Sequence, residues 1–166
     1  MTADDRKLIL GLVMHGLPQR EFLRQFRGGV ESAKLTTCLL EEALADQNAD
    51  NVEYALMVGF TFGFSSEHVD CLIRLAGASW HHKHEDVVTS LGRLRDVKAV
   101  DVLWAATQQV PDYLAFDENR ALAVKAIWAL GNIDGPEVEL MLRQLAASKD
   151  AVIRDAAQQQ LQRRKI

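Results

Sequence analysis

The pentapeptide Ala129–Ile133, with the sequence ALGNI, decides the fold, because a similar segment lies 39 positions earlier as Ser90–Leu94, SLGRL. After each segment an acidic turn leads into a second apolar stretch, Ala99–Leu103 in the earlier copy and Glu137–Leu142 in the later one. A pair of apolar segments that recurs every ~30–40 residues is typical of stacked helical repeats, in which neighbouring pairs bury each other's apolar faces. The sequence therefore predicts a row of similar helix pairs.

Weaker copies of the repeat lie on both sides of this pair. Val69–Leu72 (VDCL) matches Val100–Leu103 (VDVL) at an offset of 31, and Val58-Gly59 matches Leu91-Gly92 at an offset of 33. Asp150–Ala157 (DAVIRDAA) opens one more copy. We therefore expect the repeat to continue towards both ends of the chain.

Helical periodicity extends along almost the whole sequence. Apolar residues recur every three or four positions, as in Val30–Asp46 and Leu114–Ile133, and no alternating strand pattern persists. The breaks between these segments predict helices over 3–15, 18–27, 30–46, 51–62, 66–77, 83–94, 97–108, 117–132, 136–147 and 150–163. Short connections of this kind favour antiparallel neighbours, so the expected fold class is all-α.

Residues that start helices occur where this interpretation needs them. Asp117 is expected to precede a helix with Glu118 in its first turn, and Pro136 to occupy a first helical position. Asp150 is suited to cap the last helix, because its carboxylate can accept hydrogen bonds from free backbone amides.

The segment 84–162 resembles the HEAT-repeat proteins, especially the short bacterial HEAT-like repeats also found in phycobilin lyases. The family pattern is an acidic turn, Val-Arg, two small residues, Ala-Leu-Gly and a closing aliphatic residue. Asp150–Leu161 is similar to its opening, and both Ala126–Ile133 and Val87–Leu94 are similar to its close. The departures are Ala123 and His84 at the Arg position and Gln162 at the Gly position.

The resemblance implies a single domain over 1–166, built as a right-handed α-solenoid of about ten helices in antiparallel HEAT-like pairs. Residues 51–163 would form the repeats, with a weaker match over 51–77. Residues 1–46 do not match and would form a divergent N-terminal cap. The resemblance implies almost nothing about function, because one fold serves many functions.

Composition excludes several classes of protein. The chain has 166 residues, of which 48% are hydrophobic and 25% charged, and this excludes a disordered chain. Its formal net charge of −4 argues against a nucleic-acid binder, whose affinity depends on neutralising phosphates. Cys38 and Cys71 are expected to be small buried residues. The absence of a disulfide framework, of a signal peptide and of a membrane span predicts a cytoplasmic protein with no membrane partner.

The resemblance also implies which residues meet a partner. Helices 51–62, 83–94, 117–132 and 150–163 would line the concave face. The outward positions chosen as partner-binding candidates are Glu53, Glu85, Asp86, Thr89, Lys125 and Trp128. Trp128 has two interpretations: it packs in the core, or it is an aromatic anchor in an interface.

Two further candidates come from charge and from loop length. Between Lys34 and Arg74 there is no Lys or Arg but there are seven acidic residues, the last of which is Asp70. This run forms either a solvated face or a surface complementary to a basic partner. Tyr113 lies in the longest connection, Gln109–Phe116, which either reaches over the concave face or fills a gap between repeats.

Only Trp80–Asp86, WHHKHED, has the composition of a chemical site. Zinc normally takes three or four ligands, and no further Cys or His lies close by to complete such a set around His81 to Glu85. Nucleophile elbows and phosphate-binding glycine loops are absent from the sequence. We therefore expect neither an enzyme nor a metal or cofactor site.

The sequence favours a protein-binding module. The most specific hypothesis is a bacterial immunity or antitoxin-type protein that binds a basic toxin or effector domain through an acidic concave surface and occludes it. The alternative is a HEAT-repeat scaffold or adaptor in a larger complex, with self-association. A HEAT-like lyase subunit is a third hypothesis, and it predicts a bound cofactor.

Overall fold

The computed structural model describes residues 1–165, without the side chain of Ala33, and this part of the chain is all-helical. It contains ten α-helices and no strand. They are α1 (Ala3–Met14), α2 (Gln19–Gln25), α3 (Ser32–Asp46), α4 (Ala49–Phe62), α5 (Val69–Ala76), α6 (His84–Leu94), α7 (Val100–Gln108), α8 (Ala121–Leu130), α9 (Pro136–Ala146) and α10 (Ala151–Arg163). Four 3₁₀ turns accompany them: η1 (Phe26–Gly28), η2 (Ser66–His68), η3 (Val97–Ala99) and η4 (Asp112–Leu114). The predicted all-α class with about ten helices is confirmed.

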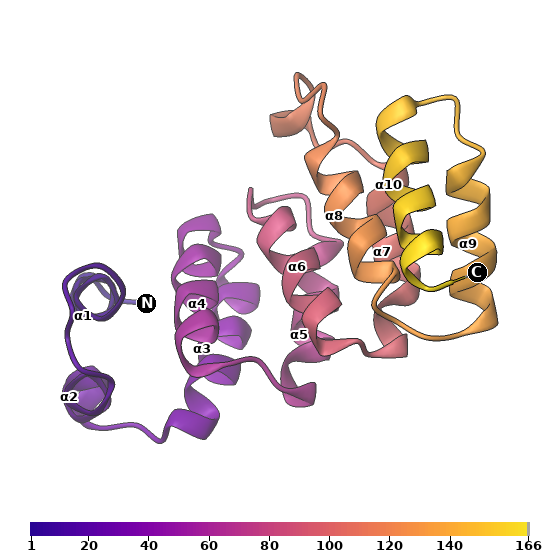
Figure 1. Ribbon diagram of the computed structural model, residues 1–166. Helices are drawn as coiled ribbons and strands as arrows, with labels where there is room; N and C mark the ends of the chain where they lie inside the picture. Colours follow the sequence, from indigo (N-terminus) through magenta and orange to yellow (C-terminus); the bar gives the residue numbers. More distant parts are fainter. Residues whose placement is uncertain (166) are drawn as a thin grey trace.

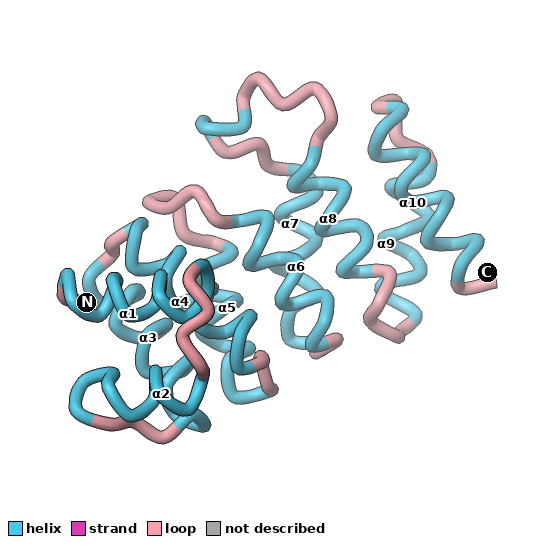
Figure 2. The backbone as a smooth tube through the Cα atoms, turned by 60° about the vertical axis from the view of Figure 1, so that its left-hand side comes forward, coloured by secondary structure: helices cyan, strands magenta, loops and turns pink. Residues whose placement is uncertain are grey.

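The helices follow one another along a row, with the two termini at opposite ends (Figure 1). α5 packs on α6, α7 on α8 and α9 on α10, so helices that are adjacent in sequence are adjacent in space. α8 also contacts both α6 and α10, which joins successive pairs. The rotated view in Figure 2 shows the same order, with the connections at the ends of the helices.

The 31-residue offset in the sequence is present in the structure. A 3₁₀ turn precedes α5 and another precedes α7, and these helices begin at Val69 and Val100. Asp96 caps the second turn by accepting a hydrogen bond from the backbone N–H of Lys98 (2.9 Å), and Ser65 and His68 form a capping box at the first. Both helices therefore begin after a 3₁₀ turn whose first backbone amides are capped by a polar side chain.

A glycine lies near the end of each of α4, α6 and α8, at the point where the following element packs closely against the backbone. A Cβ atom added to Gly92 would lie 2.7 Å from the Cβ of Ala129 on α8, and one added to Gly131 would meet the Gln160 side chain on α10. Gly59 on α4 faces the ring of Phe64 instead of another helix. Because only glycine leaves room for such contacts, the repeated Leu-Gly pattern has a packing cause.

The N-terminal helices are held differently. Phe22 and Phe26 are fully buried, and the Asp5 carboxylate is only 4% exposed. Arg27 reaches both Asp5 (2.8 Å) and Glu42 on α3 (2.8 Å), which fixes α1 and η1 to α3. An ionic network around the buried Asp5 therefore replaces the repeat contacts in this region.

Local predictions about helix ends and cysteines had mixed outcomes. Pro136 occupies the first turn of α9 and Asp150 caps α10, as expected. The predicted start of α8 at 117 is wrong, because α8 begins at Ala121. Arg120, the residue before it, has a left-handed backbone (φ 52°), and the Asp117 carboxylate accepts a hydrogen bond from the Ala121 N–H (2.6 Å). Cys71 is buried, but Cys38 is exposed, which is also contrary to expectation.

Candidate partner-binding face

The outward side chains of α4, α6, α8 and α10 form a surface that we call the even-helix face. On α8 the buried positions alternate with Lys125 and Trp128, both of which are exposed. Glu53 on α4 and Glu85, Asp86 and Thr89 on α6 are half-buried. Six of the eight predicted partner-binding residues thus lie on these helices.

Two of the acidic candidates form ion pairs between neighbouring repeats. Glu53 Oε1 lies 2.7 Å from Lys83 Nζ at the start of α6, with the side chain of Glu53 42% exposed. Glu85 Oε2 on α6 lies 2.7 Å from Lys125 Nζ on α8, with Glu85 30% exposed. The face that was expected to be acidic therefore carries matched charges at these two points.

The other two candidates on α6 differ in what they offer. The Thr89 hydroxyl donates to the backbone carbonyl of Glu85 (2.7 Å), so its hydrogen is already used. Asp86 forms no ion pair within residues 1–165. Of the predicted acids on this face, Asp86 is the one that keeps its charge for a partner.

Trp128 lies at the surface, since 42% of its side chain is exposed. The guanidinium carbon of Arg163 on α10 lies 5.5 Å from the centre of the ring, within the range of a cation–π contact. Arg163 also donates to the side-chain oxygen of Asn132 (2.7 Å) and to the carbonyl of Gly131 (3.0 Å). The core interpretation of Trp128 is thus wrong, and the basic end of α10 supports its ring.

Asp70 lies apart from this group. It is on α5, the other helix of its pair, where Lys98 Nζ lies 3.2 Å from its carboxylate. Most of the acidic run behaves in the same way, since Lys or Arg side chains from outside the run reach four of its seven acids within the described residues. These four are Glu42, Asp50, Glu53 and Asp70.

Tyr113 joins the 109–120 connection to the connection between α5 and α6 and to the first residue of α6. Its hydroxyl lies 2.9 Å from His84 Nδ1, and its ring is 4.7 Å from that of His82. His84 Nε2 lies 2.6 Å from the carbonyl of Ala78, so Nε2 carries the hydrogen and Tyr113 donates to Nδ1. Of the two sequence interpretations, the structure supports the one in which this residue closes a gap between repeats.

The histidine cluster is engaged with the backbone. The ring of His81 is fully buried, its Nε2 lies 2.8 Å from the carbonyl of Leu75, and its Nδ1 accepts from the Lys83 N–H (3.0 Å). Burial, as the largest cause, lowers the pKa of His81 to about 4 and also lowers that of His84. No group of three or more metal-ligating side chains is close enough to hold an ion within the described residues.

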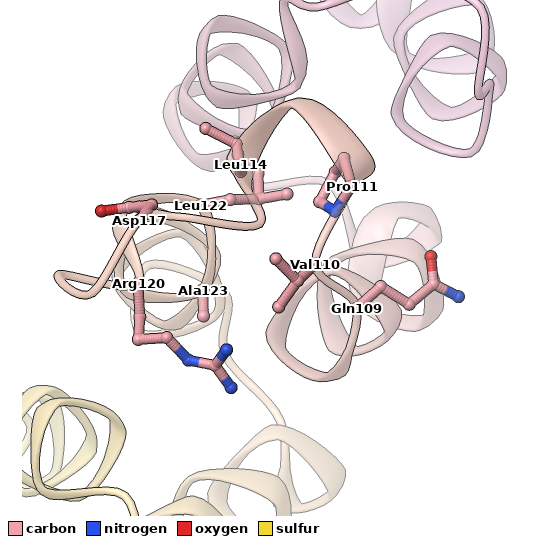
Figure 3. A pocket seen from close by; sticks show the side chains of 8 residues that line it. All are labelled: Gln109, Val110, Pro111, Leu114, Asp117, Arg120, Leu122 and Ala123. Atoms are coloured by element: carbon pink, nitrogen blue, oxygen red, sulfur yellow. The ribbon is translucent and has the colours of Figure 1, made fainter.

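Two hollows adjoin the 109–120 connection. The first has a volume of about 10 Å³, room for about one water molecule, and Figure 3 shows the eight side chains around it. The second is a cleft of about 580 Å³ between the 76–84 and 109–113 segments, with Tyr113, His82 and Asp112 among its polar residues and Val88 and Leu122 among its apolar ones. Both ring nitrogens of His84 are already bonded, so this histidine and Tyr113 hold the two segments together.

Sequence reasoning did not select two residues that the structure brings forward. Arg163 was not among the candidates, although its guanidinium lies over the ring of Trp128. Phe116 ended the loop named for Tyr113, and its side chain is 97% exposed. The signal for Phe116 was present in the apolar sequence of its loop.

Comparison of the chain with protein-family models, curated proteins and solved structures gave no match. The described helices are too short or too polar to cross a membrane.

Proposed function

We propose that this chain is a HEAT-like α-solenoid that acts as a protein-binding module, with its partner on the even-helix face. The observation that carries the proposal is Trp128, an aromatic side chain 42% exposed between the charged side chains of Lys125 and Arg163. Trp and Arg are the residue types most enriched at the energetic centres of protein interfaces.

The specific role that we propose is that of an immunity-type protein which occludes a basic toxin or effector domain. The Glu53–Lys83 and Glu85–Lys125 pairs are solvent-exposed, and such pairs contribute only about 0–1 kcal/mol. A partner's Lys or Arg can therefore replace Lys83 or Lys125 at little cost, while Asp86 is available at once. In this role, carboxylates of the face pair with cations that the toxin uses on its own substrate.

The test is a charge reversal with a matched control. The triple variant Glu53→Lys, Glu85→Lys, Asp86→Lys changes the even-helix face, and Glu67→Lys, Asp101→Lys, Glu137→Lys makes the same charge change on exposed residues elsewhere. The partner is isolated with the tagged wild-type chain, and its affinity for each variant is measured by calorimetry. We expect at least a tenfold loss for the first set, roughly the effect of several interfacial charges, and little for the second.

Equal losses in the two sets would overturn docking on this face. A partner that is acidic, or that is only a second copy of the chain, would replace the immunity role by the scaffold alternative. One observation favours that alternative: exposed apolar side chains lie at both ends of the row, with Met14 on α1 and Leu140 on α9. Sedimentation of the purified chain at micromolar concentration decides between a monomer and a self-associating scaffold.

A further inference from the structure

The connection between α7 and α8, residues 109–120, extends beyond the ends of the neighbouring helices. Figures 1 and 2 both show it as a loop that rises clear of the row. Its residues 110–116 read VPDYLAF, with Asp112 as the single charged side chain. Connecting segments at a protein surface are usually polar, so an apolar loop in this position needs a physical reason.

Part of that reason is packing on the molecule itself. Tyr113 bonds to His84, and Leu114 packs against the core. These contacts do not involve Phe116, whose side chain is 97% exposed, far more than any other large apolar side chain in the described chain. The gap-filling role of the loop thus explains Tyr113 and Leu114 and leaves Phe116 unexplained.

The loop is held in one shape by its own hydrogen bonds. The N–H groups of Leu114, Ala115, Asp117 and Glu118 donate to carbonyls within the loop, at 2.8–3.2 Å. The Asp117 carboxylate accepts from the N–H groups of Asn119 and Ala121 and thereby fixes the end of the loop to α8. A side chain presented on such a rigid loop binds without the entropy cost of ordering the loop.

The charged residues that flank Phe116 in the sequence are acidic. Asp112 and Glu118 are exposed, and neither forms an ion pair within residues 1–165. The nearest cation in sequence, Arg120, is directed to Asp150 (3.1 Å), and Figure 3 shows its side chain extending away from Pro111 and Leu114. The surface that fits this loop is therefore apolar at its centre and basic at its rim.

We infer that Phe116 is an anchor that inserts into an apolar pocket of the protein partner, with Lys or Arg at the pocket's rim opposite Asp112 and Glu118. This inference rests on the proposed function, because it takes the partner to be the basic protein. It adds a second contact region, at the loop end of α8, to the even-helix face.

The experiment compares two truncations of exposed apolar side chains. Phe116→Ala removes the anchor, and Leu140→Ala removes a 58% exposed side chain on α9 as a matched control. With the partner isolated through the wild-type chain, we expect Phe116→Ala to weaken binding by at least about 30-fold and Leu140→Ala by less than about threefold. Phe116→Trp should retain most of the affinity. Both truncated variants should melt at the wild-type temperature, since neither side chain is buried.

The charged rim is tested with Asp112→Asn, Glu118→Gln. We expect this variant to associate more slowly than the wild type and with a weaker dependence on salt, because it keeps the anchor and loses the steering charges. An unchanged association rate would remove the basic rim from the inference.

The outcomes separate this inference from the proposed function. If Phe116→Ala binds like the wild type while the even-helix charge reversal does not, the anchor is overturned and the proposed face stands. If Phe116→Ala alone loses binding, the anchor stands and the face is overturned. Flotation of the wild-type chain, but not of Phe116→Ala, with phosphatidylcholine–phosphatidylglycerol vesicles would assign the loop to a membrane and overturn the inference. A dimer that Phe116→Ala abolishes would assign the loop to a second copy and overturn it equally.

Discussion

The N-terminal helices α1–α3 and the helices α5–α10 are held together by different forces. Between α6, α8 and α10 the contacts recur: a glycine meets the next helix, and the Asn132 amide and the Arg163 guanidinium each donate to the carbonyl of such a glycine. In the N-terminal region, buried phenylalanines and the Asp5–Arg27–Glu42 network replace these contacts. Recurring close contacts at glycines therefore join the helices of one part of the molecule, whereas a specific ionic network joins those of the other.

The largest expected effect comes from disrupting the close contact between Gly92 on α6 and Ala129 on α8. Gly92→Ala places a Cβ 2.7 Å from the Cβ of Ala129 and 2.8 Å from its Cα, so α6 and α8 must separate. We expect the free energy of unfolding, measured in urea, to fall by about 3 kcal/mol, as in other overpacked sites. Gly77→Ala is the control, because its nearest neighbour is 3.9 Å away, and it should change stability by less than about 1 kcal/mol. Equal stability of both variants would show that the glycine contact does not hold the repeats.

Breaking the ionic network should have the next largest effect. Burial alone raises the pKa of Asp5, but hydrogen bonds from Arg27 and Thr2 outweigh it and lower the pKa below its usual value. Asp5→Asn keeps the shape and leaves Arg27 without its buried partner, which we expect to cost about 2 kcal/mol at pH 7.

The pH dependence distinguishes this loss from a packing defect. A carboxyl group with a lowered folded pKa contributes stability above its unfolded pKa of about 4, and this stability is lost as the pH falls through the folded value. The difference between wild type and Asp5→Asn should therefore shrink below about pH 4. A constant difference down to pH 2 would contradict the ionic origin.

The part of the fold that the sequence predicted is the part in which packing is encoded by neighbours along the chain. Apolar spacing and the Leu-Gly pattern indicated the ten helices, because helix packing depends on which residues share a face. The run of acids, in contrast, allowed two interpretations from the sequence, because Lys83 and Lys98 reach it only through the fold. The late start of α8 could not be predicted from apolar periodicity, because it depends on the left-handed backbone of Arg120.

The candidate site was predicted in part for the same reason. The helical face of α8 predicted an outward position for Lys125 and left Trp128 between core and surface, and both side chains are exposed. Asp70 was grouped with them by its charge, although it lies on the other helix of its pair. Phe116 was noted with Tyr113 at the end of this loop but not chosen as a candidate, because its exposure depends on how the 109–120 loop turns outward, which follows from hydrogen bonds within that loop.

The third prediction concerns how the stability of the helices α5–α10 depends on pH. His81 lies in the repeat region, and burial lowers its pKa from 6.5 to about 4. The unfolded chain therefore binds a proton that the folded chain does not, and stability falls as the pH decreases through this window. From pH 6.5 to about pH 5 we expect a loss of about 1.5 kcal/mol from this group.

The control for this prediction uses two histidine variants. His81→Gln should reduce the slope of stability between pH 6.5 and 5, whereas His15→Gln, at an exposed residue, should leave it unchanged. His68 and His84 have lowered pKa values as well, with burial as the main cause, so the slope is reduced and not abolished. The repeat region thus responds to acid at a higher pH than the N-terminal network does. A wild-type stability that is flat from pH 6.5 to 5 would refute this distinction.

The smallest expected effect concerns the ion pairs that join repeats on the even-helix face. Lys125→Met removes the partner of Glu85 and keeps the aliphatic stem, and we expect unfolding in urea to change by about 0.5 kcal/mol or less, because both side chains are solvent-exposed. This weakness is what allows a basic partner to take the place of Lys125. Glu139→Gln, which breaks the exposed Arg143 pair within α9, is the control and should have an equally small effect on stability.

The two variants should differ only in partner binding, where Lys125→Met frees Glu85 and strengthens the interaction with a basic protein. A stability loss above about 2 kcal/mol for Lys125→Met would show that the pair holds the repeats together, and the charge exchange proposed for this face would then be too costly.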